Sequence, residues 1–229
     1  MKRFHLILIG LSSSIVILSL NRLTPITQTY LQPFEFLRLM DVLAMIPIPL
    51  SSVLLYVLLK EQITKSTHVL YTLILITGIY LFAAGSGDHE VTNYLNIRFC
   101  DSGKSTTAIC NSIAYNDDEF SHYVYYAGFI LLNIALMAYE YSYPRIKRIR
   151  GIDIAGIFAN SFIIGLGIFA NLAFEEIGID LYIFGAVMLL AIWLLFKGKQ
   201  PATYLPATMY FAMSYTLGVT GTVVYGMIK

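Results

Sequence analysis

Charged residues are scarce in this chain. Only 13% of its 229 residues are Asp, Glu, Lys or Arg, whereas 57% are hydrophobic, and the mean hydropathy is +0.69. A soluble domain usually carries about 25% charged residues. The apolar residues fall in long runs, which are typical of membrane spans rather than of a soluble core. The sequence therefore predicts an integral, multi-pass membrane protein and leaves the host membrane open.

Several motifs of soluble enzymes and nucleic-acid-binding proteins are also missing. The formal net charge is +1, which gives no basic excess for binding nucleic acid. No zinc-finger spacing, phosphate-binding loop or serine-nucleophile elbow occurs. No lysine falls in the middle of an expected span, so retinal attachment is excluded as well. We therefore expect a membrane lipid as the partner and no nucleic acid, and we leave open a protein partner.

The apolar runs predict an all-α fold, a bundle of seven transmembrane helices that forms one membrane domain over residues 1–229. A helix satisfies its own backbone hydrogen bonds, and ~20 residues cross the hydrocarbon. With the N-terminus inside, ten of the fifteen Lys and Arg fall on the inner side, so we expect an outer C-terminus. The first span resembles a signal peptide but lacks a cleavage site, which favours a retained anchor. The expected spans are 4–20, 35–59, 68–95, 119–143, 152–176, 179–196 and 203–227.

Cysteine is rare, and its placement is informative. Both cysteines, Cys100 and Cys110, lie in the longest expected outer loop, 96–118. Two cysteines on an oxidising face predict one disulfide, with two unpaired thiols as the alternative. Proline is confined mostly to loops, but Pro47 and Pro49 fall inside the second span, where we expect a kink.

Polar residues gather at the expected outer ends of the spans. Such groups are costly inside a membrane and usually mark a site or a packing contact. Asp118, His122 and Asn133 share one face of the fourth span at helical spacing, and the third and fifth spans carry similar stripes. Because lipid-facing stripes would be costly, we expect them to face one another in one polar site. Its expected members include Asp41, Glu90, Asn93, Asn133, Asn160 and Asn171.

Two histidines in this region are candidate metal ligands. His89 and His122 lie at the ends of helices joined by one loop, and Glu175 offers a carboxylate from the fifth span. Imidazole with carboxylate suits zinc, iron or manganese. Glu119-x-x-His122 has the spacing of di-metal bundles, but a second such pair is missing. The alternative is that these groups are solvated caps at helix ends.

Three short motifs resemble the alkaline ceramidases, which are seven-span, metal-dependent lipid amidases. They are "EFLRLMDVLAMIPIPL", "GSGDHEV" and "DDEFSHYVYY". The resemblance implies a site with Ser86, His89 and Asp118 at matching positions. The H-x-x-x-H pair of that family's last span is missing, because residues 203–227 contain no histidine. His122 would then replace a lost ligand, or the chain is a related but inactive scaffold.

The leading hypothesis is a metal-dependent membrane hydrolase of a lipid amide or ester. A metal on His89 and His122 would activate water. Asp118 or Glu119 would be the general base, and Ser86 would support the oxyanion. A proton-coupled small-molecule transporter is one alternative, and a non-enzymatic membrane sensor or assembly protein is another. The sequence does not identify the substrate or the oligomeric state.

Overall fold

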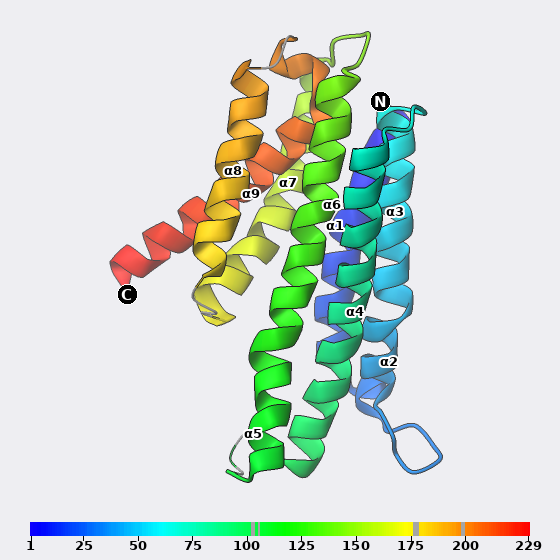
Figure 1. The fold of residues 1–229 in the computed structure, drawn as a ribbon, viewed down its shortest axis with the longest axis vertical. Helices are drawn as coiled ribbons and strands as arrows, with labels where there is room; N and C mark the ends of the chain where they lie inside the picture. The colour runs from blue at the N-terminus through cyan, green and yellow to red at the C-terminus, as the bar shows by residue number, and fades with distance from the viewer. Residues whose placement is uncertain (102–103, 105, 176–178, 198–199) are drawn as a thin grey trace. The chain divides into compact units, whose positions relative to one another are not determined.

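The computed structural model describes residues 1–101, 104, 106–175, 179–197 and 200–229, with Glu175 described for its backbone alone. Over these residues the chain is helical apart from its connecting loops, as Figure 1 shows. The α-helices are α1 (Lys2–Leu23), α2 (Leu39–Met45), α3 (Pro47–Ile63), α4 (Val69–Phe99), α5 (Ala108–Tyr115), α6 (Ser121–Ser142), α7 (Gly151–Ala170), α8 (Asp180–Lys197) and α9 (Pro206–Ile228). Two π-helical turns, η2 (Asn116–Phe120) and η3 (Asn171–Glu175), and two 3-10 turns, η1 (Pro25–Gln28) and η4 (Ala202–Tyr204), complete the order.

These helices supply seven candidate membrane spans among the described residues, which confirms the predicted number. Each span is long and apolar enough to cross the bilayer, and it satisfies its backbone hydrogen bonds internally. The chain is therefore an integral multi-pass membrane protein. The inner N-terminus and outer C-terminus stay predictions. The spans are Lys2–Leu23, Leu39–Ile63, Val69–Phe99, Ala108–Ser142, Gly151–Phe174, Asp180–Lys197 and Pro206–Ile228.

The second span is interrupted where the prolines predict a kink. Helix α2 ends at Met45 and α3 begins at Pro47, so the break falls at Ile46. Proline lacks a backbone N–H, and its ring disfavours the helical conformation of the residue before it. Ile46 accordingly is displaced from ideal helical dihedrals while staying in the right-handed helical region, with φ −114° and ψ −74°. The predicted disulfide between Cys100 and Cys110 is also present, with the two Cα atoms 5.5 Å apart.

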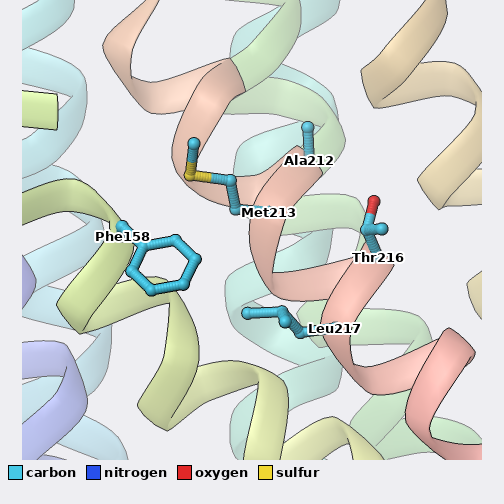
Figure 2. A pocket seen from close by; sticks show the side chains of 5 residues that line it. All are labelled: Phe158, Ala212, Met213, Thr216 and Leu217. Carbon is cyan, nitrogen blue, oxygen red and sulfur yellow. The ribbon is translucent and has the colours of Figure 1, made fainter. Parts of the chain in front are cut away.

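The chain divides into two compact units, and each is described by itself. Unit 1 contains Met1–Ser13, Leu55–Leu75 and Leu132–Lys229. Within it α9 packs on α7 and α8, and the large side chains of Phe184, Tyr210 and Tyr215 are fully buried. A cavity of about 260 Å³ lies beside α7 and α9, lined by Phe158, Ala212, Met213, Thr216 and Leu217 (Figure 2). This lining is almost wholly apolar and holds none of the predicted site residues.

Unit 2 contains Ser14–Leu54 and Ile76–Leu131. Two glycines bring α4 and α6 into close approach within it. A Cβ on Gly85 would lie 2.6 Å from the Cα of Tyr125, and one on Gly128 would lie 2.6 Å from the Cα of Phe82. Glycine at a helix crossing lets two backbones pack directly on each other in a membrane. This close packing brings the polar residues of α4 next to the start of α6.

Candidate functional site

The candidate site lies in unit 2 and is centred on His89 of α4. The Nε2 atom of His89 lies 3.1 Å from the guanidinium of Arg22, at the end of α1. Its Nδ1 atom lies 3.3 Å from both the backbone carbonyl oxygen and the carboxylate of Asp117, in the π-turn η2. The two ring nitrogens therefore face two partners that differ in charge, a guanidinium at Nε2 and a carboxylate residue at Nδ1.

These two partners determine the tautomer of His89. A guanidinium can only donate hydrogen bonds, so Nε2 must accept from Arg22 and carries no proton. The proton then resides on Nδ1, which bonds the backbone carbonyl oxygen of Asp117; the carboxylate Oδ1 lies 3.3 Å away and has no hydrogen-bond partner among the described residues. A carboxylate at Nδ1 and a lone pair on Nε2 are the arrangement in which histidine acts as a general base. The geometry is therefore that of an oriented, neutral imidazole.

Asp117 is itself held by amide donors. Its Oδ2 atom accepts from Asn96 at 3.1 Å and from Asn93 at 3.4 Å, and its side chain is buried. The hydroxyl of Ser121 donates to the Asp117 backbone carbonyl at 2.9 Å. A buried carboxylate needs such partners, because an uncompensated charge in a poorly solvated place is costly.

The π-turn η2 decides which acid faces inward. A regular helix places Asp118 one turn before His122, which is why the spacing pointed to Asp118. In a π-turn the residue one turn back is five positions away, which is Asp117. Asp118 and Glu119 are both exposed in the structure. Their assignment as the general base stays a prediction, whereas Asp117 is the acid in contact with His89.

A buried ion pair between Arg38 and Asp41 adjoins the contact between His89 and Asp117. Arg38 holds Asp41 through two hydrogen bonds of 2.8 and 3.1 Å, and Asp41 also accepts from the Arg38 backbone N–H at 2.7 Å, which caps the start of α2. Arg38 further donates to Asn93 at 3.2 Å. Since Asn93 also donates to Asp117, it links the Arg38–Asp41 ion pair to the His89–Asp117 contact.

The cluster contains more buried acid than fixed positive charge. Arg22 lies 3.5 Å from Glu90, so Arg22 and Arg38 face three buried carboxylates, Asp41, Glu90 and Asp117. One oxygen of Glu90 and the side-chain oxygen of Asn96 are buried with no hydrogen-bond partner among the described residues. Unsatisfied buried acceptors of this kind call for a donor such as water, a proton or a ligand.

His122 completes the cluster on the α6 side. Its ring centroid lies 4.7 Å from that of His89 and 5.9 Å from that of Tyr126. The two candidate histidines are therefore brought together, as the sequence predicted. No group of three or more His, Cys, Asp or Glu side chains in the described part of the chain is arranged to hold a metal ion. Because Arg22 also occupies Nε2 of His89, the described residues do not fit the predicted metal in this arrangement.

The remaining predicted members of the site have other partners or belong to unit 1. The hydroxyl of Ser86 is buried and donates to the carbonyl oxygen of Phe82 at 2.8 Å. Asn133 and Asn160 belong to unit 1 and have hydrogen-bond partners there. Asn171 also belongs to unit 1, where its buried side chain has no hydrogen-bond partner among the described residues. The side chain of Glu175 lies outside the described residues.

Four residues of the site are absent from the set predicted from the sequence: Arg22, Arg38, Asn96 and Asp117. Arg22 lies on the predicted outer side, where the positive-inside rule predicts few basic residues. This exception is a sequence feature that could have identified Arg22 as a candidate site residue. The spacing of a regular helix does not predict Asp117, because it does not anticipate the π-turn.

In comparisons with known proteins, no family model, no curated protein and no solved structure matches this chain. The resemblance to alkaline ceramidases therefore stays a prediction from three motifs.

Proposed function

We propose that the protein is a membrane hydrolase that cleaves an ester or amide bond of a lipid, with His89 as its general base. The observation that supports this proposal is the alignment of Arg22, His89 and Asp117, which leaves Nε2 of a neutral imidazole unprotonated. Aligned acid–imidazole pairs recur in hydrolases of unrelated folds. The metal predicted from the sequence stays a separate prediction.

The proposed reaction begins when the substrate carbonyl displaces Arg22 from His89. The Arg22 side chain is 47% exposed, so it has room to move toward a ligand. Nε2 of His89 takes a proton from water while the water oxygen attacks the carbonyl carbon. Arg22 then faces the oxyanion, and Asp117 stabilises the imidazolium through Nδ1–H. The imidazolium returns the proton to the leaving alcohol or amine as the bond breaks.

The test is hydrolysis of a panel of lipid esters and amides by purified protein in mixed micelles. We expect His89→Gln and Asp117→Asn each to lower the rate on the order of 100-fold, the usual contribution of a positioned general base. His68→Gln is the matched control, because His68 is exposed and belongs to unit 1. If no lipid in the panel is turned over by folded wild-type protein, the proposal fails.

The same preparations decide the metal prediction. Elemental mass spectrometry would measure zinc, iron and manganese in wild-type protein and in the His89→Ala, His122→Ala double variant. Stoichiometric metal that the double variant loses would support a metal-dependent hydrolase in which Arg22 moves away. Absence of metal in an active wild-type preparation would leave the acid–imidazole route alone.

A second candidate function, proton-coupled transport, is favoured by the surplus of buried acid. Glu90 has one oxygen without a hydrogen-bond partner in the described structure, which is a place for a proton to bind. In proteoliposomes with an internal pH dye, a carrier would move protons only with its substrate, and Glu90→Gln would abolish that movement. Hydrolysis without proton movement would reject this candidate.

A further inference from the structure

The loop between the first two spans, residues 24–38, folds back on itself as a short hairpin. Tyr30 and Arg38 form an antiparallel bridge, and the backbone N–H of Leu31 donates to the carbonyl of Leu37 at 2.8 Å. The N–H of Leu39 donates to Thr29 at 2.9 Å. In Figure 1 this loop is the blue hairpin beside α2. Its tip contains the sequence "PFEF", residues 33–36.

The tip is held in an unfavourable backbone conformation. Phe34 has φ 68° and Glu35 has φ 51°, although neither residue is glycine. In this left-handed region the Cβ atom crowds the following carbonyl, so residues with large side chains rarely adopt it. Such conformations persist only where surrounding contacts impose them, and they cluster at functional segments.

Arg98, at the end of α4, is the main source of those contacts. It donates to the backbone carbonyl of Glu35 and forms an ion pair with its carboxylate at 3.0 Å. The hydroxyl of Tyr94 donates to the same carbonyl. The Arg98 guanidinium also lies over the Tyr30 ring at 5.3 Å. Together these contacts fix the base and one side of the tip and leave the phenylalanines outside.

The residues that this scaffold displays are apolar. Phe34 is 87% exposed and Phe36 is 49% exposed, and Leu23 and Ile26 at the start of the loop are exposed as well. Four large apolar side chains are thus exposed within one loop of fifteen residues and its first flanking residue, where two membrane spans meet. The loop joins the spans Lys2–Leu23 and Leu39–Ile63, so its two ends lie where the chain leaves and re-enters the bilayer.

We propose that the "PFEF" tip is a membrane-interface anchor whose Phe34 and Phe36 lie among the lipids of the leaflet beside it. The occupant is lipid because the loop joins two membrane spans and directly follows Leu20 and Leu23, which are exposed residues of the span α1. Aromatic rings are favoured at the headgroup level. This anchor does not depend on the proposed hydrolase. Phe36 nevertheless lies two residues from Arg38 of the polar cluster, so lipid at the tip would be next to that cluster.

The single tryptophan of the chain makes a direct test possible. Trp193, in α8, is 52% exposed within a membrane span and reports on the hydrocarbon. The test variant combines Trp193→Phe with Phe34→Trp in phosphatidylcholine vesicles. Lipids brominated high on the acyl chain would quench fluorescence from the interface, and iodide would quench it from water. Trp193→Phe with Ser66→Trp is the water-exposed control, because Ser66 lies in an exposed loop.

We expect Trp at position 34 to be quenched by the brominated lipids and to be several-fold less accessible to iodide than Trp at position 66. Adding Arg98→Met should release the tip and raise the iodide accessibility. Equal iodide accessibility at both positions, without quenching by lipid, would overturn the proposal. Protection from iodide without quenching by lipid would also overturn it, because a protein would then cover the tip. Phe36→Trp replaces Phe34→Trp if the latter does not fold.

Discussion

The buried polar groups of unit 1 differ from those of unit 2 in what they contact. In unit 1, Glu140 accepts from the backbone N–H groups of Ala207 and Thr208 at 2.9 and 2.7 Å and from the Thr208 hydroxyl at 2.9 Å. Asn133 accepts from Tyr56 and donates to Tyr215, both at 2.8 Å. In unit 2 the buried charged side chains contact one another, and Glu90 keeps one oxygen without a hydrogen-bond partner among the described residues.

This difference separates two uses of polar residues inside a membrane. Glu140, in α6, accepts from backbone N–H groups in the first turn of α9, which have no partner within their own helix, so it serves the fold. The contacts around His89 join mostly charged and polar side chains to one another, although Asp41 also caps α2 and His89 also contacts the Asp117 carbonyl oxygen. Polar groups that do not stabilise the fold are the ones expected to serve function. Replacing residues in each unit should therefore affect different properties.

The largest expected effect is in unit 1. Glu140→Leu should lower the free energy of unfolding by about 4 kcal/mol, because it leaves three buried donors of α9 unsatisfied. Reversible unfolding in detergent with added SDS would measure this loss. Glu61→Leu is the control, since the Glu61 side chain is 46% exposed and its ion-pair partner among the described residues is Lys60. Equal losses for the two variants would contradict the capping role of Glu140.

The next effect is expected in unit 2 and should be reversible by a second change. Arg38→Met alone should cost about 3 kcal/mol, because Asp41 is fully buried and would lose its counter-ion. The double variant Arg38→Met, Asp41→Asn should recover most of this loss in the same unfolding assay, since asparagine carries no unpaired charge and still accepts from the backbone N–H of residue 38. Failure to recover would show that Arg38 and Asp41 serve the fold as Glu140 does.

The fold could be predicted from the sequence more fully than the site. The length of the apolar runs predicts all seven spans, and Pro47 predicts the break after α2. The cysteine pair in one loop predicts the disulfide. These features depend on local composition. Which carboxylate meets His89 depends on the π-turn η2, and a single extra residue in a turn leaves no periodic signal in "NDDEF".

Other parts of the site depend on tertiary packing that the sequence does not encode locally. Helical spacing grouped Asn133 with Asp118 and His122, but Asn133 instead bonds two tyrosines in unit 1. Arg22 and Asn96 become site residues only because their helices pack beside α4 and η2. From the sequence alone, a polar residue on a helix cannot be assigned to a hydrogen bond or to a packing contact until the neighbouring helix is known.

A smaller effect is expected from the tyrosine contacts of Asn133. Tyr56→Phe removes one buried hydrogen bond and should lower the free energy of unfolding by about 1 kcal/mol. Tyr80→Phe is the matched control, because Tyr80 is 71% exposed and should change stability little. A larger loss for Tyr80→Phe than for Tyr56→Phe would contradict a structural role for Asn133.

The smallest effect on stability is expected at His89. His89→Gln should change the free energy of unfolding by less than about 0.5 kcal/mol, because glutamine retains a donor and an acceptor, and Arg22 keeps its pairing with Glu90. The same unfolding assay measures the change, with His68→Gln as the control. A loss as large as that expected for Glu140→Leu would place His89 among the residues that hold the fold together. A His89→Gln variant that is as stable as wild type but no longer hydrolyses lipid would instead show that His89 serves activity. Glu140 of unit 1 would then serve stability, and His89 of unit 2 would serve function.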